Sequence, residues 1–335
     1  MNQIVVVTGA NTRMGRAAAD GVARAGHDLV ILSRNPERLE RPAGHTRGQG
    51  VRALAIPIDV ADAAAVEAAP DKAGRELGPI DIWINVAMAT VFSLVARLTS
   101  EGIDRGTRVT YLGQVHASMS ALKRMRVRDR GVVVNIGSAL AYSAASLQSV
   151  YRGAKAAICG FTASPRSKII DDKLNVRATM MDLPAINTPQ FDWALNKTGR
   201  YLQPVPPIVE PEVAARAIRS AAENRRRNVW VGYPPVQAIL GNRIATGLID
   251  GYLAKAGYSA QLTSEVRPDN APSNPSEPVE GDHGSLGRCD DRARSHSIQM
   301  FMGRHRTVSC KLAGLATVLG RRRGARRGHV AGRTE

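Results

Sequence analysis

The sequence predicts an α/β fold built on one doubly wound parallel sheet, with a layer of helices on each face. Short runs dominated by Val and Ile alternate with longer segments of helical pattern over roughly the first 235 of the 335 residues. Strands that are apolar throughout are typical of parallel sheets buried on both faces. Because parallel strands need crossover connections, the intervening helices are expected to cover the sheet in right-handed units.

The order of the elements follows from these runs. The predicted strands are the apolar segments 4–7, 28–32, 52–56, 80–84, 131–136, 175–181 and 229–232. The segments with helical character are 14–25, 62–76, 103–127, 150–170 and 211–223. Hydrophobic residues make up 44% of the chain and aromatic residues only 4%, so the core is expected to be aliphatic and rich in alanine. We assign residues 1–255 to this domain.

Residues 256–335 are predicted to form a poorly ordered polar linker and basic tail. Residues 264–285 are rich in Pro, Ser, Asn, Asp, Glu and Gly, and they bury too little apolar surface to offset the entropy of ordering. Residues 286–335 contain twelve Lys and Arg against three Asp and Glu, over half of the net charge of +17. The charge therefore does not predict nucleic-acid binding by the main domain. The apolar stretch Cys310–Leu319 in the tail also fits a helix that contacts a membrane surface.

Composition and motifs exclude several other classes of protein. Cys159, Cys289 and Cys310 are scattered and match neither a disulfide framework nor the spacing of zinc ligands, so no metal site is predicted. The first apolar run is too short for a secretory signal, and no stretch approaches the length of a membrane-spanning helix. A cytoplasmic protein is expected.

A strand, a glycine turn and a helix open the chain. The run 4–7 leads into Thr8-Gly9-Ala10-Asn11-Thr12-Arg13-Met14-Gly15, and a helical pattern follows. Glycine permits close approach of a backbone to a diphosphate, and free N–H groups at the start of a helix attract anions. The turn is therefore predicted to hold the phosphates of a dinucleotide. The residues expected to contact the cofactor here are Gly9, Asn11, Thr12, Met14 and Gly15.

The ends of the next two strands indicate which dinucleotide is bound. Ser33 and Arg34 stand where an NAD-binding protein carries an acidic residue for the ribose 2′-hydroxyl. An arginine favours a 2′-phosphate by its charge and its forked donors, so NADP(H) is predicted in preference to NAD(H). An ordinary surface arginine is the alternative. The third strand ends in Asp59 and Val60, where Asp59 would recognise the adenine amino group or cap the helix that begins at Asp62.

Three residues around the fifth strand form a candidate set for acid–base chemistry. Ser138 follows that strand, and Tyr151 and Lys155 are four residues apart, on one face of a predicted helix. A tyrosine hydroxyl with a pKa of about 10 is a poor acid or base at neutral pH, but a neighbouring ammonium lowers that pKa. The serine can donate a hydrogen bond to a substrate oxygen. Together with the dinucleotide turn, this set predicts an oxidoreductase that moves hydride between NADP(H) and a carbonyl or secondary alcohol.

In this combination and order the motifs resemble those of the short-chain dehydrogenase/reductase family, which are single-domain Rossmann oxidoreductases. The resemblance covers residues 3–235 and rests on Thr8, Gly9, Gly15, Asp59, Val60, Asn85, Ser138, Tyr151, Lys155, Pro184 and Thr188. It implies that Tyr151 is the acid–base residue and that Ser138 polarises the carbonyl. It also implies that Lys155 lowers the pKa of Tyr151 and binds the nicotinamide ribose. The further cofactor contacts implied are those of Asn85, Ala87, Pro184 and Thr188.

Several positions depart from the family pattern. Arg13 stands where the family usually has glycine, and Val86 and Met88 replace an asparagine and a glycine after the fourth strand. Thr110 aligns with a helix asparagine whose backbone carbonyl, in the family, holds a water on the lysine. Pro165 lies within the predicted helix of Tyr151, where it is expected to cause a kink. These departures support a second hypothesis, an NADP(H)-binding protein with weak or no catalysis. Binding of a polyanion or a membrane surface by the tail is a third.

The substrate is predicted only by the character of its pocket. An apolar lid over a small, apolar carbonyl or alcohol substrate is one interpretation of the aromatic and aliphatic residues after the sixth strand, which are Phe191, Trp193, Leu195, Tyr201 and Leu202. The same residues would also suit a core or a subunit contact. The family resemblance implies a homo-oligomer, a dimer or a tetramer.

Overall fold

A computed structural model describes residues 2–143, 146–268, 271, 273, 289–297 and 300. The chain divides into two compact units, Met1–His296 and Ser297–Glu335. All elements described below belong to the first unit. The predicted membrane-contacting stretch Cys310–Leu319 and almost all of the second unit lie outside the described residues. Within the described residues, no helix is both long enough and apolar enough to cross a membrane.

The central sheet confirms the predicted fold class. In the described part of the chain it has seven strands, all paired in parallel. Their order across the sheet is β12 (Asn228–Trp230), β7 (Val176–Leu183), β6 (Gly131–Ser138), β4 (Ile82–Asn85), β1 (Ile4–Thr8), β2 (Asp28–Ser33) and β3 (Ala53–Pro57). Each corresponds to a predicted strand, with ends that differ by one or two residues. The strand order reverses at β1, where such sheets bind their ligands.

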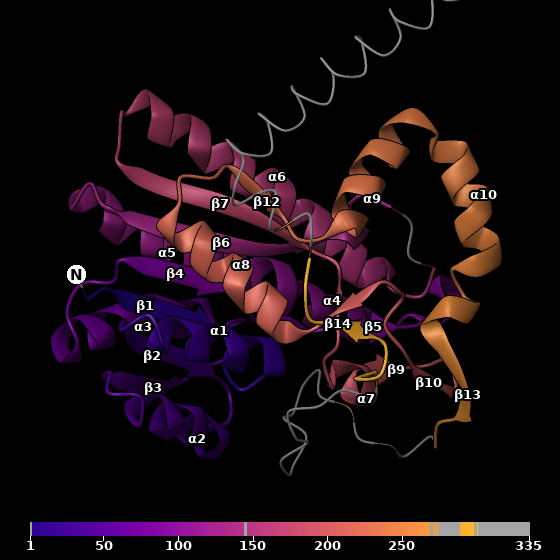
Figure 1. Cartoon of the computed structure of the whole chain (residues 1–335), viewed down its shortest axis with the longest axis horizontal. Helices are drawn as coiled ribbons and strands as arrows, with labels where there is room; N and C mark the ends of the chain where they lie inside the picture. Colours follow the sequence, from indigo (N-terminus) through magenta and orange to yellow (C-terminus); the bar gives the residue numbers. More distant parts are fainter. Residues whose placement is uncertain are drawn as a thin grey trace, which may run out of the picture. The chain divides into compact units, whose positions relative to one another are not determined.

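Helices cover both faces of this sheet and complete three layers (Figure 1). The helices that pack together on one face are α1 (Arg13–Ala23), α2 (Pro36–Arg47) and α8 (Pro211–Glu223). Those on the other face are α3 (Ala63–Glu76), α5 (Gly113–Val127) and α6 (Ser149–Asp171). Pro165 lies inside α6, which continues past it to Asp171.

Helix α2 has no counterpart in the sequence prediction. Its two prolines and its largely polar composition hide the helical pattern, because proline normally marks a helix boundary. Pro36 occupies the first turn, where its missing N–H costs nothing, and Asn35 caps the helix by accepting from the Arg38 amide at 2.9 Å. The buried side of the helix, which includes Leu39, then packs against the domain.

The predicted helix 103–127 is divided in two. Helix α4 (Ser100–Thr107) passes through a π-helical turn, Arg108–Leu112, into α5. A π turn inserts an extra residue into the helical ladder and commonly marks a functional site. Thr110 lies at its centre.

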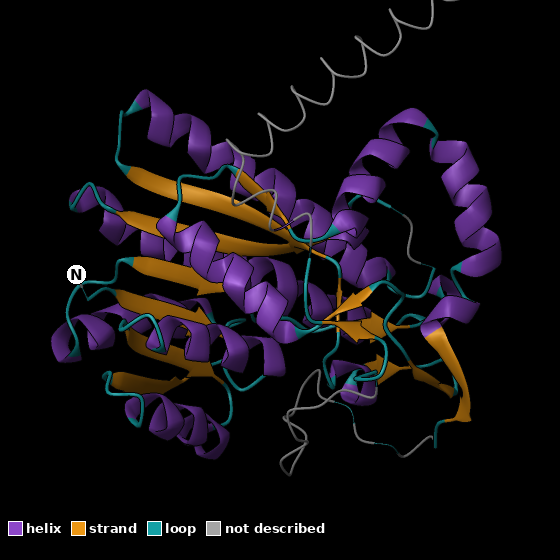
Figure 2. Ribbon diagram, viewed as in Figure 1, coloured by secondary structure: helices purple, strands orange, loops and turns teal. Residues whose placement is uncertain are grey.

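The carboxyl ends of the main strands carry an additional layer of small elements (Figure 2). Within the described part of the chain it consists of three small sheets, β5 (Val91–Phe92) with β9 (Leu195–Asn196), β10 (Arg200–Leu202) with β13 (Leu262–Val266), and β8 (Ala185–Ile186) with β11 (Ile208–Val209) and β14 (Ala293–Arg294). The helices here are α7 (Gln190–Trp193), α9 (Tyr233–Ile244) and α10 (Thr246–Ala256). Strands β13 and β14 follow the predicted boundary at residue 255, and the first unit extends to His296.

Candidate active site

The turn between β1 and α1 is held in shape by its own hydrogen bonds. The Thr12 hydroxyl donates to the Gly9 carbonyl at 2.8 Å and accepts from the Gly15 amide at 3.1 Å. Gly9 has a φ of +69°, in the left-handed region that favours glycine. A Cβ on Gly15 would lie 2.2 Å from the Gly9 carbonyl oxygen, so this close approach requires glycine. The turn places the positive end of α1 at the carboxyl edge of the sheet.

Arg13 is accommodated as the first residue of α1. Its side chain is 11% exposed and lines the main cavity of the first unit. The Nη1 atom is buried without a hydrogen-bond partner among the described residues and lies 3.8 Å from the carboxylate of Asp290. A buried guanidinium with an unused donor, next to a helix amino terminus, favours an anionic ligand.

Arginines gather at the ends of β2 and β3. Arg105 of α4 forms a 2.6 Å ion pair with Asp59, whose carboxylate also accepts from the Ala61 amide at 2.9 Å. Helix α3 is capped by Asp62, not by Asp59. Arg34 is partly buried, and its pKa is lowered by burial and by the charge of Arg105. Arg105 was not predicted as a site residue, because it lies in α4, 46 residues along the chain from Asp59, with which it pairs.

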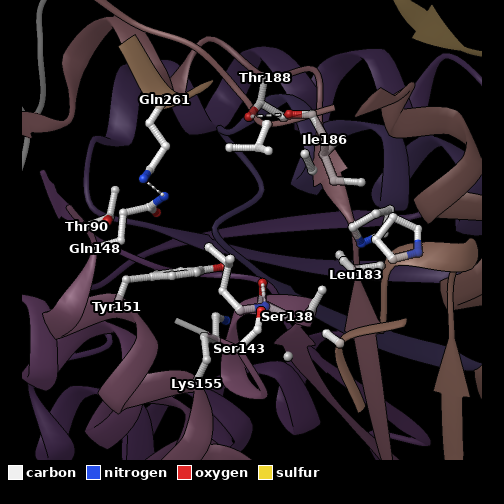
Figure 3. A pocket seen from close by; sticks show the side chains of 18 of the residues that line it. Thr90, Ser138, Ser143, Gln148, Tyr151, Lys155, Leu183, Ile186, Thr188 and Gln261 are labelled. Atoms are coloured by element: carbon white, nitrogen blue, oxygen red, sulfur yellow. Dashed lines mark hydrogen bonds between the residues drawn. The ribbon is translucent and has the colours of Figure 1, made fainter. Parts of the chain in front are cut away.

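Ser138, Tyr151 and Lys155 line the same cavity, as predicted from their spacing (Figure 3). The Ser138 oxygen accepts from the Leu140 amide at 3.2 Å, which leaves its own proton free to be donated. The Tyr151 hydroxyl points toward Ser138. Lys155 is 1% exposed; its ammonium donates to the Ile136 carbonyl at 2.6 Å and lies 5.5 Å from the centre of the Tyr151 ring.

Burial dominates the protonation of this trio. It raises the pKa of Tyr151 to about 12, although the nearby Ser138 hydroxyl acts in the opposite direction. It lowers the pKa of Lys155 to about 8, because the ammonium is removed from water. The lowering of the Tyr151 pKa by Lys155, which the family resemblance implies, stays a prediction. The tyrosine is protonated at neutral pH and is suited to donate its proton to a substrate oxygen.

The cavity around these residues has a volume of about 710 Å³ and is lined mainly by apolar side chains. Pro184 and Thr188 line it, as do Phe191 and Trp193 of the predicted lid. Leu202, by contrast, belongs to a buried cluster at the edge of the cavity. Helices α9 and α10, which were not predicted from the sequence, supply further apolar walls through Leu240, Ile249 and Leu253.

The comparison with known families agrees with this geometry. A model of the family described as short chain dehydrogenase matches residues 3–197, more than half of the chain. The chain belongs to the short-chain dehydrogenase family. Among the described residues, no group of His, Cys, Asp and Glu is arranged to hold a metal ion.

Several short-chain dehydrogenase relatives are similar over most of this chain. The oxidoreductase YxnA of Bacillus subtilis is 28% identical over 280 residues, which are 82% of this chain and 76% of that protein. A short-chain dehydrogenase from Streptomyces avermitilis has the same fold, with a TM-score of 0.64, 22% identity and coverage of 77% of this chain and 98% of that one. An alcohol dehydrogenase from Thermococcus sibiricus, complexed with 5-hydroxy-NADP, gives a TM-score of 0.58 at 23% identity, over 69% of this chain and 95% of that one.

The loop after β4 departs from the family pattern, and hydrogen bonds join it to Thr8 at the end of β1, where the glycine turn begins. The Thr8 hydroxyl accepts from the Val86 and Ala87 amides at 3.0 and 3.1 Å. Val86 and Met88 line the cavity. The Asn85 side chain faces the other way, into a buried network in which it donates to Asn135 at 2.8 Å. Because the side-chain amide of Asn85 is engaged in this network, the cofactor contact predicted for Asn85 would be made by its backbone.

Thr110, which aligns with the family's helix asparagine, lies in the π-helical turn between α4 and α5. Its hydroxyl donates to the Ala89 carbonyl at 2.6 Å and accepts from the Ala89 amide at 2.9 Å. The side chain is fully buried and ties the π turn to the loop after β4. Thr110 thus fixes the backbone at this point without an amide side chain.

A buried carboxylate next to the trio was missed by sequence reasoning. Asp182 is paired with Gly137 in the strand register, is fully buried, and accepts from the Tyr142 hydroxyl at 3.0 Å. A Cβ on Gly137 would lie 2.4 Å from an Asp182 carboxylate oxygen, so the glycine before Ser138 makes room for this acid. Cys159, one helical turn after Lys155, also faces Asp182, with sulfur and oxygen 4.0 Å apart.

The charge of Asp182 acts on Lys155. Burial raises the pKa of Asp182 to about 6, so the group is ionised at neutral pH, and its negative charge favours the protonated lysine. In Asp182→Asn this support is lost while an acceptor for Tyr142 remains. We expect the pKa of Lys155 to fall below about 8, and the pH at which NADPH affinity declines to move down by about one unit.

The measurement is the dissociation constant of NADPH as a function of pH, by fluorescence titration. Asp171→Asn is the matched control, because Asp171 is an exposed carboxylate at the end of α6, the helix that carries Lys155. An unchanged pH profile in Asp182→Asn would show that the acid has no electrostatic effect on the site.

Proposed function

We propose that this chain is an NADP(H)-dependent oxidoreductase that transfers hydride between the cofactor and an apolar carbonyl or secondary alcohol. The observation that carries the proposal is the meeting of Ser138, Tyr151 and Lys155 in one largely apolar cavity, whose lining also includes Thr12, Arg13 and Met14 of the glycine turn. Apolar walls exclude water and strengthen the electrostatic interactions of the few polar groups inside.

The residues divide the reaction between them. In the reductive direction, Tyr151 donates its proton to the carbonyl oxygen as that oxygen becomes an alkoxide. Ser138 donates a hydrogen bond to the same oxygen and withdraws electron density from the carbonyl. The Lys155 ammonium, held by the Ile136 carbonyl, stabilises the negative charge that develops on the tyrosine. The nicotinamide, when bound, supplies or accepts the hydride.

The proposed cofactor site follows the carboxyl edge of the sheet. The turn around Gly9, Asn11, Thr12, Met14 and Gly15 would hold the diphosphate, with Arg13 as an additional positive charge. Asp59 and Val60 would contact the adenine, and Lys155 the nicotinamide ribose. Further contacts are proposed for Asn85 and Ala87 through the backbone, and for Tyr151, Pro184 and Thr188 around the nicotinamide.

The preference for NADP(H) rests on Arg34. It lies at the end of β2 close to Arg105, so the positive charge there exceeds the single negative charge of Asp59. Replacing Arg34 by Ala is expected to raise the KM for NADPH about 10- to 100-fold and to leave the KM for NADH within about two-fold, because charge-assisted hydrogen bonds contribute about 1.5–3 kcal/mol.

Steady-state kinetics with both cofactors checks this prediction. Arg24→Ala is the control, because Arg24 is exposed at the opposite end of α1. Equal losses with NADPH and NADH would place Arg34 outside the 2′-phosphate site.

The test of the function is NADPH oxidation against a panel of ketones and aldehydes, accompanied by calorimetric titration with NADPH. Binding with turnover is the expected result. Binding without turnover on the whole panel would favour the second hypothesis, a nucleotide-binding protein without catalysis. Absence of binding would contradict both.

Assembly and location complete the proposal. We expect a dimer or a tetramer, supported by the exposed apolar side chains of Met119 and Val127 on α5 and of Ile170 on α6. The cytoplasmic location, and the contact of the tail with a polyanion or a membrane surface, stay predictions.

A further inference from the structure

The apolar cavity contains a group of uncharged polar side chains on one side. Thr90 comes from the loop before β5, Gln148 from the residue before α6, and Gln261 from the residue before β13. Figure 3 shows Thr90 and Gln148 beside each other next to Tyr151, with Gln261 reaching toward Gln148. Leu183 lies on the other side of Tyr151, in the segment proposed to hold the nicotinamide. The polar group therefore lies on the side where the rest of the substrate would extend.

The two glutamines hold each other in place. Gln148 donates to the Gln261 side-chain oxygen at 2.9 Å, and Gln261 donates to the Gly257 carbonyl at 2.6 Å. Both side chains are more than nine-tenths buried. Among the described residues, this bond uses one amide hydrogen of Gln148 and leaves its other amide hydrogen and its side-chain carbonyl oxygen available to a ligand. Gln148 precedes Tyr151 by three residues, as the residue before α6, and both side chains line the same cavity.

The Thr90 hydroxyl has no hydrogen-bond partner among the described residues, although Thr90 is only 7% exposed. Leaving a buried hydroxyl unpaired costs on the order of 1–3 kcal/mol. Valine has nearly the same shape and would avoid this cost. A hydroxyl in this position is explained if a ligand supplies the missing partner.

The charges around the cavity restrict that ligand. Among the described lining residues, Arg13 and Lys155 are the charged ones, and both belong to the proposed cofactor side. The described lining of the cavity offers a carboxylate no cation beyond these two, and burying an uncompensated charge is costly. An uncharged oxygen of the ligand is a partner that fits these surroundings.

We propose that Thr90 and Gln148 form a subsite for a second, uncharged oxygen of the substrate. The substrate class is then an apolar hydroxyketone, diketone or keto ester, or the corresponding diol or hydroxy ester, and not a simple ketone or a keto acid. The inference rests on the proposed function. The first oxygen is the reacting carbonyl at Tyr151 and Ser138, and the second binds Thr90 as donor or acceptor.

The experiment compares matched substrates in wild type, Thr90→Val and Thr90→Ser. One substrate is a medium-chain methyl ketone, and the other is the same ketone with a hydroxyl on the neighbouring carbon. For each protein, kcat/KM for the hydroxyketone is divided by kcat/KM for the simple ketone. Dividing this ratio in a variant by the ratio in wild type cancels the intrinsic difference in reactivity between the two substrates. Thr90→Val is expected to lower this ratio about 5- to 30-fold, and Thr90→Ser to keep it within about two-fold, since serine retains the hydroxyl.

A second readout separates the subsite from a structural role. Because Thr90→Val removes an unpaired buried hydroxyl and keeps the volume, its Tm without substrate is expected to equal or exceed that of wild type. A lower Tm would assign the hydroxyl to the fold and overturn the proposal. A keto acid reduced as well as its methyl ester would overturn the assignment to an uncharged oxygen.

The failure of this inference differs from that of the proposed function. If the simple ketone is reduced and the ratio is the same in all three proteins, the subsite does not exist while the function stands. If NADPH binds and neither ketone nor any other carbonyl is reduced by wild type, the proposed function fails, and with it the substrate class.

Discussion

Tyr151→Phe is expected to lower kcat about a thousand-fold while leaving the affinity for NADPH within about two-fold of wild type. The proposed proton donor is lost, and no other phenol, carboxyl or imidazole lines the cavity close to Ser138 among the described residues. The phenyl ring keeps the apolar packing against Lys155. The residual rate would come from Ser138 and from the positioning of the substrate.

Single-turnover reduction of a ketone by bound NADPH measures this loss, with calorimetry for the affinity. Tyr252→Phe is the control, because Tyr252 also lines the cavity but is 69% exposed at its rim. Similar rates for Tyr151→Phe and wild type would remove Tyr151 from the mechanism, and the function would then need another proton donor.

Gly15→Ala is expected to abolish measurable NADPH binding. The added Cβ would lie 2.2 Å from the Gly9 carbonyl oxygen and 2.8 Å from the Ala10 Cα, and both contacts are with backbone atoms that cannot rotate away. The turn must therefore open, which separates the Gly9 carbonyl from the Thr12 hydroxyl and displaces the start of α1. The amides proposed to hold the diphosphate would no longer converge, and the unfolding free energy would fall by about 1–3 kcal/mol.

Gly21→Ala, in the same helix, is the matched control. Its added Cβ would meet its nearest neighbour, the Ala215 Cβ, at 3.9 Å, which is an ordinary contact. Because alanine is more favourable than glycine in the interior of a helix, this variant is expected to be as stable as wild type or slightly more stable. Thermal unfolding and NADPH titration of both variants give the comparison. Wild-type affinity in Gly15→Ala would show that the turn does not bind the cofactor.

Local patterns were sufficient to predict the sheet and to place Tyr151 and Lys155 on one helix face. The apolar runs around Val5–Val7 and Val132–Val134 are buried on both sides, so they read as strands without tertiary information. The spacing of Tyr151 and Lys155 placed both on one helix face, and the glycine turn was recognised from Gly9 and Gly15. Helix α2 and the helices α9 and α10 were not predicted, because prolines, glycines and polar residues interrupt their periodicity.

Long-range contacts could not be predicted from local sequence patterns. The ion pair of Asp59 with Arg105, the buried Asp182 beside Gly137, and the bond between Gln148 and Gln261 each join residues from separate elements. Nothing in the local sequence marks Asp182 as buried or Thr90 as unpaired. The same limitation applies to Asn85, whose amide turns into a buried network that only the packing of neighbouring strands creates.

The sequence by itself predicted the parallel α/β sheet, the glycine turn after the first strand, and the placing of Tyr151 and Lys155 on one helix face, because these depend on patterns within one strand, turn or helix. The tertiary structure decided what surrounds them. Burial sets the pKa of Tyr151 at about 12 and that of Lys155 at about 8, and it leaves Thr90 without a partner. Desolvation and pairing are properties of the space around a side chain, and that space is filled by residues distant in the sequence.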